Sequence, residues 1–364
     1  MTYRIVQVGV GNVGRHVLPR ILNTPGLDLV GVGVRSPGKQ GVDAGVLVGI
    51  GPVGVAATTS VDELIALRAD CVCFMASDTT HGVGRSAGGL VDQICRYLRS
   101  GANVVTTTMS GYVYPPSIPE AYRARLVEAC AAGGTSYLTV GIDPGFLSDA
   151  LPLLLTGFSG SVSRIHVQEA LNYGTYFVDD ALFGKLGFGR TPEQERDLNV
   201  AGRFAKAWAS VPQMIADRLG VDLDGIADSR DLWYTPVALK NARWSIGAGT
   251  VAAIRFTVSG MVGGEPVFTL DHVTRLSADA APAWPQPPGH GGYKVLVEGV
   301  PTMTVEVALD EPGGDANIAA LMATGFRAVN AIPLVCEAGP GVHSVFDLPP
   351  LTGRHVFRAD GWQA

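Results

Sequence analysis

The 364-residue chain is predicted to fold as an α/β domain built on a doubly wound parallel sheet, followed by an α+β domain with an open mixed sheet. Three observations support this prediction. Short apolar runs alternate with helical patterns over the first 145 residues. A glycine-rich turn separates the first apolar run from the first helical pattern, and the alternation stops after residue 145. The chain is also longer than one hydrophobic core usually grows, so two domains are expected.

The alternation begins with a strand at 5–8 that breaks at Gly9, after which apolar residues recur at helical spacing from Val13 to Leu22, with Pro19 inside the helix. A capping box of Ser60 and Glu63 opens another short helix. The later strands are expected at 27–34, 71–76, 103–107 and 136–140, and the later helices at 64–67, 89–100 and 119–132. Helices between strands imply parallel pairing, with ligands at the carboxyl ends of the strands.

The pattern changes in the rest of the chain. Strands are expected at 163–171, 254–258, 267–270 and 293–297, and helices at 192–218 and 318–329. We therefore divide the chain into a first domain, 1–145, a second domain, 146–315, and a C-terminal helix and tail, 316–364.

Composition argues against several functions. The net charge is −6 and no cluster of Lys and Arg stands out, so nucleic acid is not an expected partner. The five cysteines show no C-x-x-C spacing, which argues against a disulfide framework and against zinc, and no metal site is predicted. The N-terminus lacks a signal-peptide pattern, and no run approaches the roughly 18 apolar residues of a membrane span. We expect a cytoplasmic protein without a membrane partner.

Gly9, Gly11 and Gly14 form the pattern G-x-G-x-x-G between the first strand and the first helix. In a Rossmann fold these glycines allow a tight turn, close approach to a pyrophosphate and packing of helix on sheet, and the helix N-terminus attracts the phosphates. We therefore predict a Rossmann dinucleotide site that includes Asn12 and Val13 of the same turn. The alternative is a structural turn that holds no ligand.

The end of the second strand bears on the choice of cofactor. An NAD enzyme usually carries Asp or Glu there, but this chain has Arg35 and Ser36, with Lys39 close behind. Arg35 could clamp a 2′-phosphate, so NADP(H) is favoured, while NAD(H) stays possible. The alternative is that both cations belong to a solvated turn. By position alone, Ala76, Ser77 and Thr107 are also expected near the cofactor.

Several longer motifs resemble a known group. They are VQVGVGNVGRHV, VRSPGKQGVDAG, VGIDPGFLSDALPLLLTG, FGKLGFGRTPE and AVNAIPLVCEAGPGV. They are similar to the dihydrodipicolinate-reductase-like superfamily, and within it to the branch of 2,4-diaminopentanoate dehydrogenases and native amine dehydrogenases. The resemblance implies reductive amination of a ketone and oxidative deamination of an amine. It also implies a homodimer, and a C-terminal helix that returns to the Rossmann domain.

Two positions depart from the pattern of that branch. The branch carries a glutamate pair just before Tyr-Pro, and one of these carboxylates binds and deprotonates the amine or ammonia. The matching stretch here, 109–115, reads MSGYVYP and contains no glutamate. The usual Asn before Pro-Gly-Phe is Asp143 here, at a crossover where the nicotinamide carboxamide is expected; the alternative is an ordinary turn residue.

Other residues could supply the proton-transferring group. Tyr112 and Tyr114 lie in the loop where the glutamate is missing; a tyrosine is a plausible donor but a poor base at neutral pH, and both rings could instead only line a pocket wall. Glu169, at the end of a predicted strand, is the other catalytic candidate, with Tyr173 and Tyr176 as substrate-pocket residues. The alternative for Glu169 is a surface or ion-paired carboxylate.

Three functions are therefore compatible with the sequence. The leading hypothesis is an NAD(P)-dependent oxidoreductase that acts as an amine dehydrogenase, or as an imine or ketone reductase, on a small to medium substrate. The alternatives are carbonyl reduction without ammonia and a non-catalytic dinucleotide-binding sensor.

Overall fold

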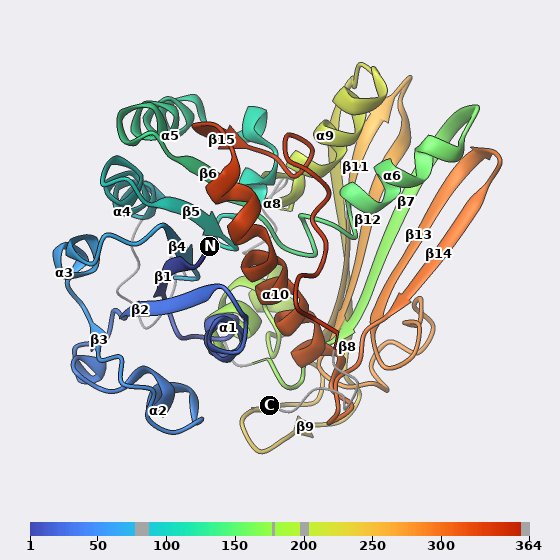
Figure 1. The fold of residues 1–364 in the computed structure, drawn as a ribbon. Helices are drawn as coiled ribbons and strands as arrows, with labels where there is room; N and C mark the ends of the chain where they lie inside the picture. Colours follow the sequence, from blue (N-terminus) through green and yellow to red (C-terminus); the bar gives the residue numbers. More distant parts are fainter. Residues whose placement is uncertain (77–86, 177–178, 197–203, 358–364) are drawn as a thin grey trace. The chain divides into compact units, whose positions relative to one another are not determined.

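The computed structural model describes residues 1–76, 87–176, 179–196 and 204–357. The chain divides into two compact units (Figure 1). The first unit comprises Met1–Gly145 and Leu321–Ala364, and the second comprises Phe146–Ala320. The fold class predicted from the sequence is confirmed, because a parallel sheet with helices is followed by a mixed sheet.

A parallel sheet of seven strands, in the order β15-β6-β5-β4-β1-β2-β3, is the centre of the first unit. Its strands are β1 (Tyr3–Val8), β2 (Leu27–Gly33), β3 (Ala57–Thr58), β4 (Cys71–Phe74), β5 (Asn103–Thr106), β6 (Ser136–Thr139) and β15 (Gly341–His343). Its helices are α1 (Gly14–Leu22), α2 (Ala44–Val48), α3 (Val61–Ala66), α4 (Ala87–Arg99) and α5 (Glu120–Gly133), joined by most of α10 (Ala316–Glu337). Three short 3-10 turns are η1 (Pro37–Lys39), η2 (Ser110–Val113) and η3 (Pro115–Ser117).

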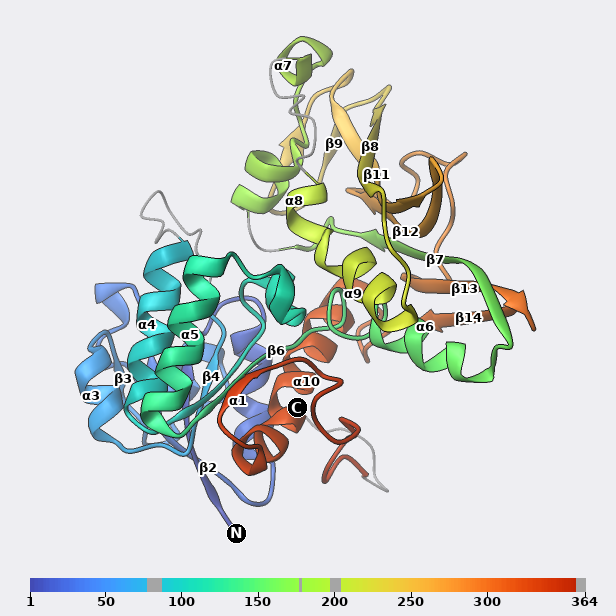
Figure 2. The same cartoon turned by 90° about the horizontal axis from the view of Figure 1, so that it is seen from above.

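Helices cover both faces of this sheet. On one face, apolar side chains of β1, β2 and β4 pack against α1 and α10, as with Ile5, Leu18 and Ile332. On the other face, Val72 and Val104 pack against α3, α4 and α5, and Figure 2 shows α4 and α5 side by side over that face. The central strands β4, β5 and β6 are therefore buried on both sides, as are most residues of β1, which explains why these strands are nearly continuous apolar runs.

The helix α10 is longer than the sequence indicated. It was expected at 318–329, but it continues through Pro333 to Glu337. By length and composition it is the one helix of the described residues that could cross a membrane, with a mean hydropathy of 1.6 over its most apolar window, but Arg327 and Asn330 interrupt its apolar run. Ala328, Val329 and Val335 of this helix belong to the core of the first unit, as in the core helix of a globular domain.

The second unit is built on a sheet of six strands in the order β14-β13-β7-β12-β11-β8, in which only β7 and β12 run parallel. Its strands are β7 (Ser161–Asn172), β8 (Gly225–Tyr234), β11 (Val251–Val262), β12 (Glu265–Arg275), β13 (Gly292–Val300) and β14 (Met303–Ala308), with a separate pair of β9 (Leu239–Lys240) and β10 (Ser245–Ile246). Its helices and turns are α6 (Ala150–Leu155), η4 (Thr156–Phe158), the π-helix η5 (Asp180–Leu186), α7 (Pro192–Arg196), α8 (Ala205–Trp208) and α9 (Ser210–Leu219).

Several local expectations need correction. The helix expected at 192–218 is divided among α7, α8 and α9, with 197–203 outside the described residues. Six strands of the described residues were not predicted, namely β3, β8, β9, β10, β14 and β15. Of these, β8 and β14 expose alternate side chains and so lack a continuous apolar run. Only half of the predicted capping box forms: Ser60 Oγ accepts from the Glu63 N–H, but the Glu63 carboxylate accepts from the Thr58 hydroxyl.

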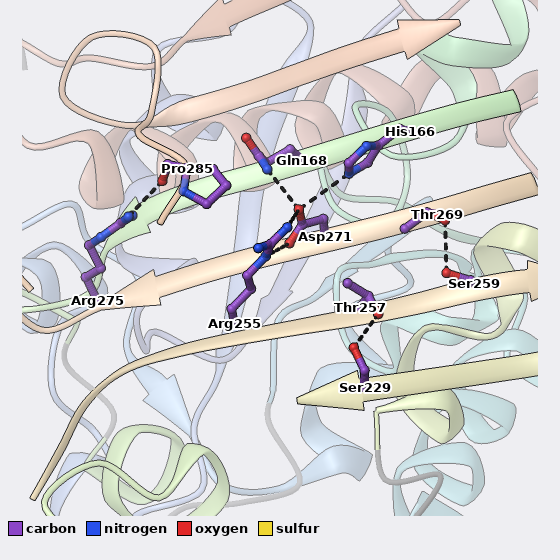
Figure 3. Close-up of polar contacts among 10 residues, drawn as sticks. All are labelled: His166, Gln168, Ser229, Arg255, Thr257, Ser259, Thr269, Asp271, Arg275 and Pro285. Atoms are coloured by element: carbon purple, nitrogen blue, oxygen red, sulfur yellow. Dashed lines mark hydrogen bonds and ion pairs between the residues drawn. The ribbon is translucent and has the colours of Figure 1, made fainter. Parts of the chain in front are cut away.

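One face of the six-stranded sheet carries a polar network, shown in Figure 3. The Asp271 carboxylate is fully buried and accepts two hydrogen bonds from Arg255, at 2.9 and 2.8 Å, and one from Gln168 at 2.8 Å. His166 Nε2 lies 3.4 Å from the same carboxylate. Burial alone raises the pKa of this carboxyl, but the bonds from His166, Arg255 and Gln168 hold its pKa well below the usual range.

Candidate functional site

The polar residues predicted in the first unit follow the carboxyl ends of its parallel strands. The glycine turn follows β1, Arg35 follows β2, Ala76 follows β4, Thr107 follows β5, and Asp143 follows β6. Because all these strands are parallel, their carboxyl ends form one edge of the sheet, where ligands of doubly wound sheets bind. Ser77 lies outside the described residues.

The glycine turn is closely packed at two of its three glycines. Gly9 has a φ of +95°, and a Cβ there would lie 2.9 Å from the backbone carbonyl of Met75. A Cβ on Gly14 would lie 2.1 Å from the carbonyl oxygen of Gly9. At Gly11, in contrast, a Cβ would meet nothing within 4 Å. The packing of the chain itself thus requires Gly9 and Gly14 and leaves open space at Gly11.

The unmet donors of this turn fit a dinucleotide. The backbone N–H groups of Gly11, Asn12 and Val13 donate no hydrogen bond within the described residues. The Asn12 side-chain Nδ2 is buried and also lacks a partner there. Buried donors without acceptors are rare in folded proteins, and a helix N-terminus attracts phosphate. These residues therefore fit the pyrophosphate of a dinucleotide.

Arg35 and Ser36 lead from β2 into η1, which ends at Lys39. The first carboxylate after this point is Asp43, whose oxygens accept from four backbone N–H groups of residues 45, 46, 53 and 54. These bonds, the one from Val53 first, lower the pKa of Asp43. The Asp43 carboxylate therefore caps the N-terminus of α2 and holds the loop at 53–54 by hydrogen bonds.

The two tyrosines of the loop after β5 differ in environment. Tyr112 lies in η2 and packs against the core beneath α4 and α5, and burial raises its pKa to about 12. Its hydroxyl therefore stays protonated at neutral pH and can donate but not accept a proton. Tyr114 follows η2 and is half-buried.

In the second unit, Glu169 lies on the sheet face opposite the Asp271 network. The register places it beside His272 on β12 and Tyr293 on β13. The Tyr293 hydroxyl donates to Glu169 Oε2, the Tyr173 hydroxyl donates to Oε1 at 3.4 Å, and His272 Nδ1 lies 3.7 Å from Oε1. The Glu169 side chain is only 5% exposed, so this is a buried carboxylate with polar side chains beside it.

Aromatic rings surround this carboxylate and imidazole. The centroid of the Phe256 ring lies 4.6 Å from that of His272, and the Trp208 ring lies 5.3 Å from it. The indole N–H of Trp208 is buried and has no hydrogen-bond partner among the described residues. Tyr173 and Tyr176 stack with their centroids 5.2 Å apart. The Glu169 carboxylate and the His272 imidazole can hold a proton. The aromatic rings form apolar walls beside them, and the Trp208 indole N–H is a donor without a partner among the described residues.

His272 and Tyr293 were not identified from the sequence. A signal was present, because Asp271 and His272 lie between the apolar residues Leu270 and Val273, and such a pair is costly to bury without partners. Strand pairing, which brings both residues beside Glu169, depends on register and so could not be read from one sequence.

The comparisons with known proteins identify the family. The model of the 2,4-diaminopentanoate dehydrogenase C-terminal domain matches residues 146–355. An amine dehydrogenase of Streptomyces virginiae is 34% identical over 95% of this chain and 96% of its own length. The chain belongs to the amine dehydrogenase and 2,4-diaminopentanoate dehydrogenase family. The resemblance noted from the sequence motifs is thereby confirmed.

Two further relatives extend the match along the chain. The 2,4-diaminopentanoate dehydrogenase of Acetoanaerobium sticklandii is 25% identical over 95% of this chain and 93% of its own length. The structure of an amine dehydrogenase from Mycobacterium smegmatis superposes with a TM-score of 0.77 and 22% identity, covering 97% and 98% of the two chains, and shows the same fold. As a member of this dehydrogenase family, the chain is an oxidoreductase, and its glycine turn fits NAD(P).

Proposed function

We propose that this protein is an NADP(H)-dependent amine dehydrogenase that interconverts a small to medium ketone and ammonia with the corresponding primary amine. Its family, its similarity to amine dehydrogenases and the residues of the glycine turn support an oxidoreductase of this class. The amine chemistry needs a carboxylate, and the loop at 109–115 has none.

The observation that carries the proposal is the buried carboxylate of Glu169. Glu169 takes a proton from the ammonium ion, which leaves neutral ammonia to add to the ketone carbon. The protonated carboxyl then returns this proton to the oxygen that departs as water. Tyr293 and Tyr173 hold the carboxylate in place, and the aromatic rings exclude water from it.

The nicotinamide, when bound, supplies or accepts the hydride. Gly11, Asn12 and Val13 would hold the pyrophosphate with their unmet donors. Arg35, with Ser36 and Lys39, would bind a 2′-phosphate by charge-assisted hydrogen bonds. Asp43, whose oxygens are already occupied, would not serve the ribose hydroxyls of NAD(H).

The test follows NADPH absorbance with a panel of aliphatic, cyclic and aromatic ketones, with and without ammonium. The proposal predicts NADPH oxidation that requires ammonium, and slower turnover with NADH. Oxidation of amines by NADP⁺ should follow the same substrate order. Tight NADPH binding with no turnover across the panel would contradict amine chemistry and favour a sensor.

The second candidate is carbonyl reduction without ammonia. The missing glutamate of the 109–115 loop favours it, because Tyr112 in that loop stays protonated and could donate to a carbonyl oxygen. Turnover that is independent of ammonium and lost in Tyr112→Phe would establish this alternative.

We further propose that the protein works in the cytoplasm as a homodimer. All five cysteines are free thiols and form no disulfide, which agrees with a reducing compartment. The dimer rests on the family resemblance. Light scattering on purified protein would test it: a mass near twice the 38.0 kDa of one chain supports the dimer, and a single-chain mass contradicts it.

A further inference from the structure

A buried glutamine lies beneath the dinucleotide turn. Gln7 is on β1, and its side chain is fully buried. Its register partners are Val32 on β2 and Cys73 on β4, so the amide stands in an otherwise apolar row of the central sheet. Such a position in a doubly wound sheet normally holds an apolar residue.

The amide of Gln7 joins the two ends of the glycine turn. Its Nε2 donates to the carbonyl oxygen of Gly9 at 3.0 Å and to that of Gly14 at 2.7 Å. Both partners are acceptors only, so the opposite amide orientation would place oxygen against oxygen. The first and last glycines of the turn are therefore held by one side chain.

Stability alone does not explain this residue. The two hydrogen bonds each contribute a modest amount, while Gln7 Oε1 is buried without a partner among the described residues. A buried acceptor without a donor offsets much of what the two bonds contribute. An apolar side chain of the same length would fill the row without this cost.

We propose that Gln7 is a positioning residue for dinucleotide binding. By fixing the carbonyl oxygens of Gly9 and Gly14, it keeps the turn closed before the cofactor arrives. The N–H groups of Gly11, Asn12 and Val13 then remain available to the phosphates. This proposal depends on dinucleotide binding and not on the amine chemistry, so the two can fail separately.

The test compares wild-type protein with Gln7→Met, which keeps the length of the side chain and removes both donors. NADPH and NADH are titrated by fluorescence, and thermal unfolding is recorded in parallel. We expect the Kd of both dinucleotides to rise roughly 10-fold, because both share the pyrophosphate, while the Tm changes little. Hydrogen exchange of the Gly9 N–H, which donates to the Gly33 carbonyl at 2.8 Å, should become faster in the variant.

The control is Ser136→Ala, which removes another buried donor of the same sheet. The Ser136 hydroxyl donates to the Gly339 carbonyl at 2.8 Å, at the amino end of β6, far from the turn along the strand direction. Ser136→Ala should lower the Tm and leave the Kd of both dinucleotides unchanged. Gln7→Glu is the second variant: its carboxyl group, when protonated, retains one donor, and its Kd should lie above the wild-type value.

An unchanged Kd in Gln7→Met would overturn the proposal. If Gln7→Met fails to fold, Gln7→Glu decides, and wild-type affinity in that variant would overturn it as well. A rise in Kd that Ser136→Ala reproduces would also count against it, because the effect would then follow stability and not the turn.

Discussion

Glu169 and Tyr293 lie opposite each other on β7 and β13, and the Tyr293 hydroxyl donates a hydrogen bond to Glu169 Oε2. The other carboxylate oxygen lies 3.7 Å from His272 Nδ1 on the neighbouring strand. Three adjacent strands thus fix one buried carboxylate from both sides. A group held in this way keeps its geometry when substrate arrives, which is what proton transfer requires.

Tyr293→Phe should weaken the site without destroying it. The change removes the hydrogen bond that the Tyr293 hydroxyl donates to the buried Oε2, and losing one partner of a buried hydrogen bond costs about 1–3 kcal/mol. We expect a free energy of unfolding lower by this amount, measured in urea, and a kcat reduced roughly 10-fold with NADPH affinity unchanged. The control is Tyr3→Phe, which removes an exposed tyrosine–glutamate hydrogen bond of the first unit, from the Tyr3 hydroxyl to Glu337 Oε1 at 3.0 Å. A kcat equal to that of wild type would show that Tyr293 does not position the carboxylate.

Arg35→Ala should reduce the preference for NADP(H). A charge-assisted hydrogen bond to the 2′-phosphate is worth about 1.5–3 kcal/mol, so the Kd of NADPH should rise about 10- to 100-fold. The Kd of NADH, which lacks this phosphate, should stay within about twofold. The control is Arg99→Ala, which removes an exposed arginine that pairs with Glu128. Equal losses for both dinucleotides would contradict the assignment.

Asp271→Asn tests the polar network in Figure 3 and its dependence on pH. The pKa of Asp271 is lower in the folded chain than its ordinary value of 3.8. Its charged form therefore stabilises the fold above that ordinary value, and the contribution is lost as the pH falls toward the folded pKa. The variant should have a lower free energy of unfolding than wild type at neutral pH, by roughly 1–3 kcal/mol. The loss stays in this range because Arg255 is partly exposed and solvent screens the ion pair.

The stability difference between the two proteins should narrow between about pH 5 and about pH 3, as followed by urea unfolding at each pH. A constant difference over this interval would mean that Asp271 does not carry the charge. Glu306→Asn, an exposed partner of Lys294, should show no such pH dependence.

The first unit could be predicted closely because its signals are local. The glycine turn, the apolar strands and the caps each depend on residues near in sequence, and β1, β4 and β5 lie where periodicity indicated them. The strand β15 escaped prediction because it is three residues long and joins β6 from the far end of the chain. No local pattern identifies such a pairing.

The candidate site of the second unit was only partly predictable. Glu169 was singled out by its place near the end of a strand, and Tyr173 by its nearness to it in sequence. His272 and Tyr293 are distant in sequence and come beside Glu169 only through strand register. The same register separates Glu169 and Asp271 onto opposite faces, although Asp271 and His272 are neighbours in the chain.

The rate of reductive amination by the variant Glu169→Gln tests most directly whether Glu169 takes the proton from ammonium. The amide keeps the size of the side chain but cannot take a proton from ammonium. We expect kcat to fall at least about 100-fold with NADPH affinity and Tm retained, while the exposed Glu306→Gln keeps wild-type activity. Ammonium-dependent turnover at the wild-type rate in Glu169→Gln would contradict the account and place the proton transfer elsewhere.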